Sequence, residues 1–404
     1  MITSLRGMND ILTDEDFKRY TYFIQTASTV AQRYGFHFIE TPILEETALF
    51  KRSVGESSDI VGKEMYQFED KGGHDVCMRP EGTAGVVRAF IQNKLDRAGG
   101  VHRFYYHGPM FRYERPQKGR LRQFHQFGVE SFGVESVLED GMMIMMVADI
   151  LDALGIGYRL QINTLGCKEC MPKYRDSLVE YIQSVEEGIC DDCKRRKDTN
   201  PIRVLDCKND RCQTLYKDAP KLLDNVCQTC SDDFAKLQKI LDENGIAYEI
   251  DTNLVRGLDY YSKTAFEFVS DNIGAQSAIA GGGRYDRLVE FLDGRATPAV
   301  GFAMGIERLM ELIVMPQEQR DGYYFGAMDE EAIQTIIQIT QRKRKTDKAT
   351  CEYRSRNLKA HLKNADRANA RYCCVIGSDE YAQKSIWVKD LVEKTESVIP
   401  LEEL

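Results

Sequence analysis

The sequence predicts an α+β protein with an antiparallel-sheet core, a small inserted cysteine-rich module and a C-terminal α/β domain. Three observations predict this arrangement. Two aromatic-rich strand candidates, residues 101–113 and 122–132, are joined by a short basic turn, as in an antiparallel hairpin. Eight of the twelve cysteines lie between residues 167 and 230. After about residue 322, strand-like and helix-like segments alternate, which is typical of a small α/β domain.

The first part of the chain alternates between helical and extended patterns. Residues 14–34 predict an amphipathic helix, because their apolar residues recur at helical spacing. Residues 35–46 alternate like a strand, which Pro42 interrupts because proline cannot donate to a sheet ladder. Beyond these, helices are expected at 82–95 and, rich in methionine, at 136–154, with a strand near 155–164.

The cysteine module interrupts the core, which then resumes. Helices are expected near 172–187 and 231–244 in the module, and strands near 247–251 and 264–270 after it. Two strand-to-helix units follow at 277–292 and 297–313. The chain therefore divides into a core at 1–165, a cysteine-rich insertion at 166–245, the core continued at 246–320, and a C-terminal domain at 322–404.

Charge and hydropathy limit the partners and the location. The net charge of −9 argues against a general nucleic-acid binder. Residues 341–371, however, hold eleven Lys and Arg against three acidic residues. This run is either an electrostatic footprint for RNA or a solvated helix face. No stretch reaches the roughly 18 apolar residues of a transmembrane helix, and no apolar signal region is visible at the start. We therefore expect a cytoplasmic protein with no membrane partner.

The clustered cysteines are spaced like metal ligands. They read Cys-x2-Cys at 167–170, 190–193 and 227–230, and Cys-x4-Cys at 207–212. Such turns place two thiolates on one side, which suits a tetrahedral zinc ion. The best four-ligand set from spacing is Cys190, Cys193, Cys227 and Cys230, as a structural Zn²⁺ site. The alternative is a set of free thiols in a small module.

Two polar clusters in the first half could carry chemistry. Residues 79–83 place Glu81 beside Thr83 at a helix start, which suits an ammonium group or simply caps the helix. Residues 112–122 hold five cations on and around the hairpin turn, and arginine forks match phosphate oxygens. Phe124, Gln126 and Glu130 follow at even spacing, so they should share one sheet face. Together they favour a nucleotide site.

Two further clusters lie in the second half. Residues 254–261 carry Arg256, Tyr260 and Tyr261 at the entry to a strand, where the alternative is a surface turn. Residues 281–286 and 301–308 combine close-approach glycines with Arg308 near a helix start, where an arginine can reach an anion. Their spacing fits neither a P-loop nor a Rossmann fingerprint.

These motifs resemble those of the class II aminoacyl-tRNA synthetases, and within them the histidyl-tRNA synthetase family. Residues 36–56, 104–131 and 298–313 are similar to class motifs 1, 2 and 3. LVRGLDYY at 254–261 and AGGGRYD at 280–286 are similar to the two histidine-specific signatures. The resemblance covers nearly the whole chain. It implies a class II catalytic core and an anticodon-binding role for the C-terminal domain.

The resemblance also implies roles for single residues. On the amino-acid side, Glu81, Thr83 and Gln126 would hold the histidine α-amino group, Glu130 and Tyr261 would bond the imidazole nitrogens, and Tyr260 would line the pocket. On the ATP side, Glu114 would read adenine, Phe124 would stack on it, and Arg308 would bind the γ-phosphate. Arg112 and Arg256 would bind the α-phosphate and the amino acid. Arg112, Arg256 and Arg308 would thus be the catalytic cations.

The implied activity is ATP-dependent activation of L-histidine to histidyl-adenylate, followed by transfer to the 3′ end of tRNA(His). Mg²⁺ would bridge the phosphates. A homodimer is expected, because motif 1 is a dimer element of the class. One alternative is a catalytically inactive regulatory subunit of ATP-phosphoribosyltransferase, and another is an RNA-binding or sensor protein with an inactive core. The three arginines and the C-terminal domain favour the enzyme.

Overall fold

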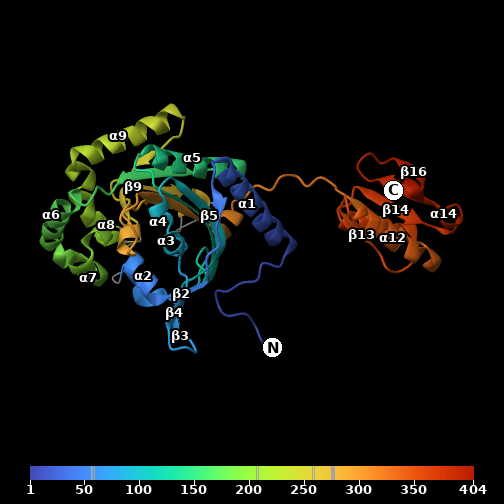
Figure 1. Ribbon diagram of the computed structural model, residues 1–404, viewed down its shortest axis with the longest axis horizontal. Coiled ribbons are helices and arrows are strands. Elements are labelled where there is room, and N and C mark those ends of the chain that lie inside the picture. The colour runs from blue at the N-terminus through green and yellow to red at the C-terminus, as the bar shows by residue number, and fades with distance from the viewer. Residues whose placement is uncertain are drawn as a thin grey trace. The chain divides into compact units, whose positions relative to one another are not determined.

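The computed structural model describes residues 1–55, 58, 60–205, 207, 209–256, 258, 260–273 and 278–404. They form two compact units, Met1–Met315 and Pro316–Leu404 (Figure 1). The C-terminal domain expected from residue 322 lies within the second unit.

An eight-stranded, mainly antiparallel sheet forms the centre of the first unit. Its spatial order is β1-β5-β6-β11-β10-β9-β7-β8. The predicted hairpin is its longest pair, antiparallel from His102/Phe132 to Phe111/Gln123. The strands are β1 (His37–Phe38), β5 (His102–Phe111), β6 (Gln123–Phe132), β7 (Arg159–Thr164), β8 (Glu249–Ile250), β9 (Ser262–Val269), β10 (Ala278–Arg284) and β11 (Ala299–Gly305). Because β10 and β11 insert between β6 and β9, they bring the late motifs beside the hairpin.

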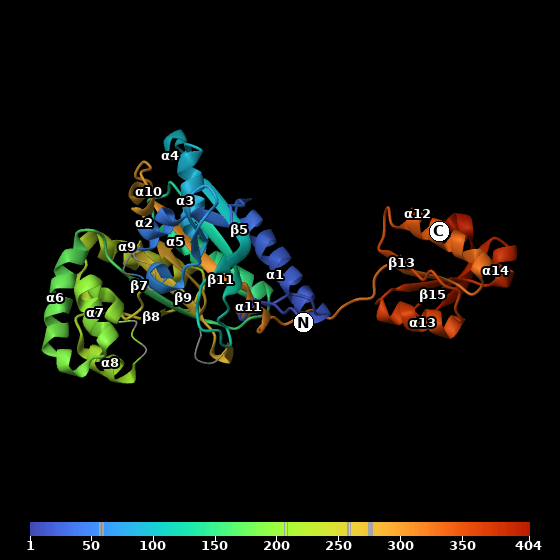
Figure 2. The same ribbon diagram turned by 90° about the horizontal axis from the view of Figure 1, so that it is seen from below.

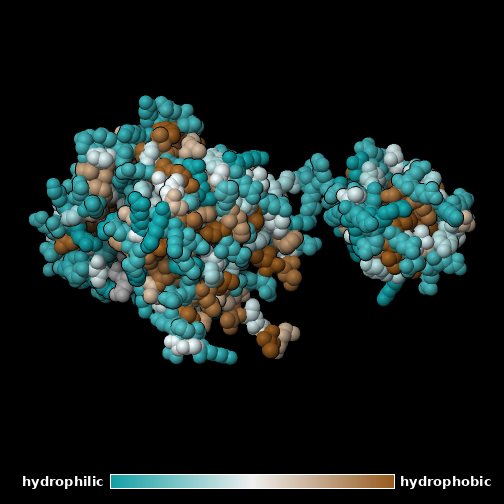
Figure 3. All heavy atoms as spheres, viewed as in Figure 1, coloured by the Kyte–Doolittle hydropathy of each residue, from teal (hydrophilic) through white to brown (hydrophobic). Residues whose placement is uncertain are grey.

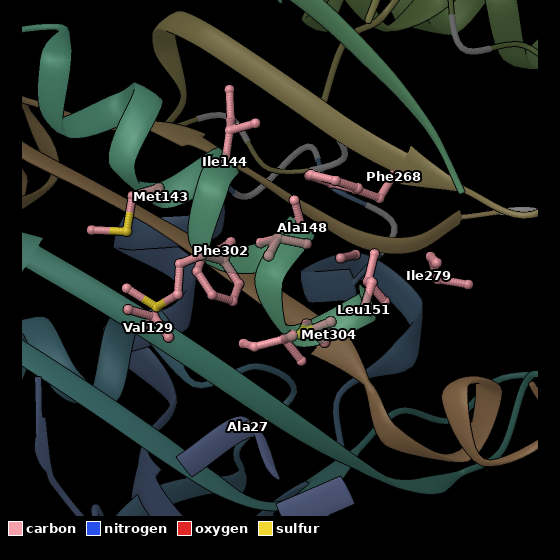
Figure 4. Close-up of a cluster of buried hydrophobic side chains, with 14 of the residues drawn as sticks. Ala27, Val129, Met143, Ile144, Ala148, Leu151, Phe268, Ile279, Phe302 and Met304 are labelled. Carbon is pink, nitrogen blue, oxygen red and sulfur yellow. The ribbon is translucent and has the colours of Figure 1, made fainter. Parts of the chain in front are cut away.

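One face of this sheet carries the main hydrophobic core, under helices α1 (Asp14–Arg33), α5 (Leu138–Ala153) and α11 (Ile306–Met310). Figure 4 shows α5 residues Met143, Ile144, Ala148 and Leu151 among apolar residues of the strands. The methionine stripe is thus core. In β6, Phe127 and Val129 face this core, whereas Phe124 and Phe132 belong to a cluster on the other face. The even-numbered polar residues of β6 therefore lie opposite the main core.

Helices α2 (Thr47–Val54), α3 (Thr83–Gln92), α4 (Leu95–Ala98) and α10 (Leu288–Phe291) belong to the side opposite the main core. A small antiparallel sheet, β2-β4-β3, adjoins them; its strands are β2 (Leu44–Glu46), β3 (Gln67–Glu69) and β4 (Asp75–Met78). The extended run at 35–46 is therefore two strands in different sheets, which Pro42 separates. β3 and β4 escaped prediction because they are only three and four residues long, and β3 is also exposed throughout.

The cysteine module is helical and has its own core. Its helices are α6 (Cys170–Ser184), α7 (Asp191–Thr199), α8 (Asp210–Leu215) and α9 (Gln228–Glu243), and Figure 2 shows α6, α7 and α8 grouped together. Tyr174, Leu178 and Ile182 of α6 belong to the module's core, while Leu237 and Leu241 of α9 pack into the main core. The predicted helices correspond to α6 and α9. Helices α7 and α8 were not predicted, because they are short and charged and their apolar residues show no clear helical period.

The second unit is built on a five-stranded sheet of order β13-β12-β14-β15-β16. β12 pairs in parallel with β13 and β14, and β15 pairs antiparallel with β14 and β16. The predicted alternation covers the chain as far as β14, and the antiparallel pair is additional. The elements are β12 (Tyr323–Ala327), α12 (Ile333–Lys343), β13 (Ala349–Cys351), α13 (Leu358–Arg367), β14 (Tyr372–Ile376), α14 (Ser378–Ala382), β15 (Ser385–Asp390) and β16 (Glu396–Pro400).

Within the described part of the chain, we find no helix with the length and apolar character that crossing a bilayer requires. Hydrophilic residues cover most of the visible face of each unit in Figure 3.

Candidate active site

A cavity of about 620 Å³ lies where the hairpin, β9, β10, β11 and the start of α3 meet. Each residue with a predicted role in histidine or ATP binding lines this cavity, except Glu130. The residues on its wall are Glu81, Thr83, Arg112, Glu114, Phe124, Gln126, Arg256, Tyr260, Tyr261 and Arg308. The fold thus brings together four sequence clusters that lie between Glu81 and Arg308 in the chain.

Glu81 is buried where α3 begins. One of its carboxylate oxygens accepts a hydrogen bond from the Thr83 backbone N–H at 2.7 Å, and the other accepts from Ala84 N–H at 2.9 Å. Burial raises the pKa of Glu81, whereas these two donors and the Arg112 charge lower it. The carboxylate therefore caps the helix start, as one of the two alternatives from the sequence predicts, and it also lines the cavity.

Glu130 lies behind Thr83, with 1% of its surface exposed. Its Oε1 accepts from Thr83 Oγ1 at 2.7 Å and from Tyr106 Oη at 3.2 Å, and its Oε2 accepts from Tyr285 Oη. Burial raises the pKa of Glu130 to about 8, although these hydroxyl donors partly offset it. Both carboxylate oxygens of Glu130 therefore accept hydrogen bonds from hydroxyl groups, which fixes its position beside Thr83.

Three tyrosine rings enclose the same corner. Ring centroids lie 4.7 Å apart for Tyr260 and Tyr261, and 5.5 Å apart for Tyr260 and Tyr285. Close beside them, Gln126 Oε1 is buried and accepts no hydrogen bond from the described residues. The corner therefore offers aromatic walls and an open acceptor to a small polar ligand.

Arg256 lies in a fixed position at the cavity wall. Its Nη1 donates to Glu267 Oε2 at 2.5 Å, and its guanidinium carbon lies 5.7 Å from the Tyr261 ring centroid. Gly281 of β10 leaves room for it, because a Cβ there would lie 2.7 Å from the Arg256 Cζ. The space that a side chain at Gly281 would take is thus occupied by the Arg256 guanidinium.

Arg112 and Arg308 both line the cavity and are both held by backbone carbonyls. Arg112 Nε donates to Pro80 O at 2.9 Å, and its guanidinium carbon lies 5.2 Å from the Phe124 ring centroid. Arg308 donates to Gly119 O at 2.9 Å and to Ala278 O at 2.8 Å. These carbonyl contacts orient both guanidinium groups without neutralising their charge.

The hairpin turn adds to this positive field. Burial lowers the pKa of Arg308, and the charges of Arg120 and Arg112 lower it further. Arg120 in turn pairs with Glu114 at 3.0 Å across the turn. A pocket in which arginine charges repel one another favours a polyanion such as a polyphosphate.

The zinc ligand set predicted from spacing is not assembled. Cys190 and Cys193 lie in one cluster with Cys207 and Cys212, while Cys227 and Cys230 lie in another with Cys167 and Cys170. The prediction was wrong because sequence spacing does not say which turns meet. The start of α9 packs beside the start of α6, and the start of α7 packs beside α8.

Sequence reasoning missed three residues of the site. Tyr106 and Tyr285 both donate to Glu130, and Glu267 fixes Arg256. Glu267 could have been found, since it is the one charged residue between the apolar residues of 264–270. Tyr285 lies in the AGGGRYD segment, which the sequence singled out without giving this residue a role, and Tyr106 gave no separate signal among the aromatic residues of 104–111.

The chain is similar to known proteins over its full length. A family model described as histidyl-tRNA synthetase matches residues 7–309, and one described as an anticodon binding domain matches residues 311–404. The chain is 72% identical over 399 residues to a histidine–tRNA ligase of Sulfurimonas denitrificans, with 99% of each chain covered. It is 64% identical over 404 residues to that of a Sulfurovum species, with 100% of each covered. The crystal structure of apo S. aureus histidyl-tRNA synthetase matches with a TM-score of 0.83 at 35% identity, covering 100% of this chain and 98% of that one. The chain belongs to the histidyl-tRNA synthetase family.

Proposed function

We propose that this cavity activates L-histidine with ATP and then transfers the histidyl group to the 3′ end of tRNA(His). The observation that carries the proposal is the lining of one cavity, which combines three arginines with a buried carboxylate and two tyrosines. Arg112, Arg256 and Arg308 offer cations for phosphates, while Glu81, Tyr260 and Tyr261 offer polar groups for an amino acid. Full-length similarity to curated histidine–tRNA ligases supports the same activity over the regulatory-subunit alternative.

The first step joins two anions. A histidine carboxylate oxygen attacks the α-phosphorus of ATP, and the bond to the bridging oxygen breaks as pyrophosphate leaves. Arg112 and Arg256 would neutralise the charge that develops on the α-phosphate, while Arg308 would hold the γ-phosphate. Because the attacking carboxylate is already ionised, the residues need to orient the reactants and not to remove a proton.

The histidine side chain would be selected by paired polar groups. Glu130 and Tyr261 would bond the two imidazole nitrogens, while Glu81, Thr83 and Gln126 would hold the α-amino group. A different amino acid would leave these buried groups unpaired, which costs about 1–3 kcal/mol for each group. Such a pocket can reject wrong substrates by roughly 10⁴ or more.

The base of ATP would lie against the hairpin. Phe124 would stack on adenine, and Glu114 would accept from its amino group. Mg²⁺ fits the donor chemistry of the wall, because Glu267 and Glu307 offer the carboxylate oxygens that it prefers. When bound, the ion neutralises phosphate charge.

The second unit would bind the tRNA anticodon. Its basic run at 341–371 includes Tyr353, whose side chain is 62% exposed, as stacking on an unpaired base requires.

We further propose a homodimer that acts in the cytoplasm. Sedimentation at micromolar concentration should give twice the chain mass, and a clean monomer would contradict the dimer.

The decisive experiment is amino-acid-dependent exchange of pyrophosphate into ATP, with each of the twenty amino acids tested separately. Exchange with histidine alone is expected, followed by charging of tRNA(His). A folded protein that binds histidine but supports no exchange would instead favour the regulatory-subunit function.

A further inference from the structure

Eight cysteine thiols of the inserted module have no part in the proposed reaction. They form two quartets, Cys167, Cys170, Cys227 and Cys230 in the first, and Cys190, Cys193, Cys207 and Cys212 in the second. In each quartet all four Sγ atoms lie within 4.8 Å of one another. Two such clusters of four thiols need a physical explanation, because a thiol gains little free energy from packing against other thiols.

The sulfur–sulfur distances fit a tetrahedral metal ion. In the first quartet, Cys167 Sγ lies 3.6 Å from Cys170 Sγ and 3.9 Å from Cys227 Sγ, and Cys170 Sγ lies 3.8 Å from Cys230 Sγ. A tetrahedron with zinc–sulfur bonds of about 2.3 Å has edges of about 3.8 Å. Disulfide bonds would need about 2.05 Å, and all these cysteines are free.

The second quartet repeats the same geometry. Cys190 Sγ lies 3.8 Å from Cys207 Sγ. It again combines two close cysteine pairs, Cys-x2-Cys at 190–193 and Cys-x4-Cys at 207–212. In each quartet, two separate turns of the chain thus place their sulfur atoms at similar distances from one another.

Backbone donors point at the sulfur atoms. The Cys227 N–H donates to Cys170 Sγ at 3.1 Å, and the Glu169 N–H donates to Cys167 Sγ at 3.4 Å. In the other quartet, the Cys190 N–H donates to Cys212 Sγ at 3.2 Å. Such donors stabilise thiolates, which are the form of cysteine that binds a metal ion.

We propose that the inserted module holds two structural Zn²⁺ ions, one in each cysteine quartet. Four thiolates close the coordination shell, so neither ion keeps an open position for catalysis. Tetrahedral all-sulfur sites suit zinc better than the harder divalent ions.

The first ion would fasten the module to the catalytic core. Cys167 and Cys170 directly follow β7, whereas Cys227 and Cys230 begin α9, so the site ties the entry of the module to its exit. Next to it, Lys263 N–H donates to Gly166 O at 2.7 Å. Lys263 Nζ also lies 3.5 Å from Asp233 of α9. The second ion would close a loop inside the module.

Metal content is the direct test. The full chain, purified without an affinity tag and without added metal, should contain about two zinc equivalents per chain by mass spectrometry of the elements. About one equivalent or fewer would overturn the two-site proposal, as would iron in place of zinc.

Matched variants assign the ions to their sites. Cys230→Ser and Cys193→Ser should each lower the zinc content by about one equivalent, and the double variant should bind almost none. Cys351→Ser, in the second unit and outside both quartets, should retain both ions. Unchanged zinc in either single variant would overturn the corresponding site.

Native alkylation tests the sites even where a variant does not fold. In the wild-type chain, iodoacetamide should label the eight clustered cysteines only after a chelator removes zinc, while the partly exposed Cys351 reacts at once. Labelling of the partly exposed Cys167, Cys190 or Cys227 as fast as Cys351 before chelation would overturn the proposal.

Discussion

Arg256 donates a hydrogen bond of 2.5 Å to Glu267, and this pair fixes a cation at the centre of the cavity wall. Glu267 lies on β9 directly across from Gly281 of β10. The guanidinium therefore lies over the glycine, held by a carboxylate of the neighbouring strand. Two of the sequence clusters, 254–261 and 280–286, meet where Arg256 lies over Gly281.

Loss of Arg256 should remove adenylate formation without unfolding the chain. In Arg256→Ala we expect pyrophosphate exchange to fall by at least about 100-fold, because a charge aimed at the transition state is lost. Glu267→Gln should cause a smaller loss of about 10-fold, because the cation remains but is less firmly positioned. Exchange kinetics and far-UV circular dichroism check both.

Arg159→Ala is the matched control for these variants. Arg159 pairs at the surface with Asp271, away from the cavity lining. Near wild-type exchange in Arg256→Ala would refute its assignment as an essential cation.

A side chain at Gly281 should act like the loss of Arg256. A Cβ there would lie 2.7 Å from the Arg256 Cζ, so Gly281→Ala must displace the guanidinium. We expect pyrophosphate exchange to drop by about 10-fold or more. The free energy of unfolding, measured without histidine, should change little. Gly157→Ala is the control, because a Cβ at Gly157 meets nothing within 4 Å. Equal rates in the two variants would contradict the packing argument.

The two-residue period of a strand was enough to predict one side of the site. It placed Phe124, Gln126 and Glu130 on a common face, and the structure confirms that this face lies opposite the main core. The same period cannot say which residues of other elements will meet that face. Thr83 and Tyr285, which donate to Glu130, come from a helix start and from a turn after β10.

The cysteine quartets show the same limit. Spacing identified each close pair, because a pair is a local turn. It could not identify that Cys227 meets Cys167 and not Cys190, because this depends on how α6 and α9 pack. Strands β15 and β16 also escaped prediction, since the alternation of the second unit ends before them.

Stability should depend on pH through Glu130. Burial raises the pKa of Glu130 to about 8 in the folded chain, against an ordinary value of 4.5. Between these values the folded state binds a proton that the unfolded state has lost, so the free energy of unfolding falls as the pH rises. The whole change amounts to at most about 5 kcal/mol, since one pKa unit is about 1.4 kcal/mol.

Glu130→Gln isolates this contribution, because the amide is similar in shape and does not titrate. Urea denaturation of both proteins without substrate, at about pH 5.5 and about pH 8, should show the larger loss of stability in the wild type. Glu81, whose pKa burial also raises, interacts with Glu130 through its charge, so the difference between the two proteins reports Glu130 together with this interaction. The same pH dependence in both would contradict the buried, protonated Glu130.

The buried ion pair between Arg284 and Asp140 should be the largest single polar contribution to the stability of the core. Arg284 belongs to the AGGGRYD segment, and its side chain is 1% exposed, against 0% for Asp140 of α5. Asp140→Ala would leave a buried guanidinium without its main partner, which costs about 3–5 kcal/mol. Asp271→Ala, which breaks an exposed pair with Arg159 at 2.7 Å, should change the stability little, because water screens the two charges. Chemical denaturation measures both.

Equal losses in the two variants would mean that Arg284 is held mainly by its bonds to the Val134 and Ser136 carbonyls and to Asp286, and not by Asp140.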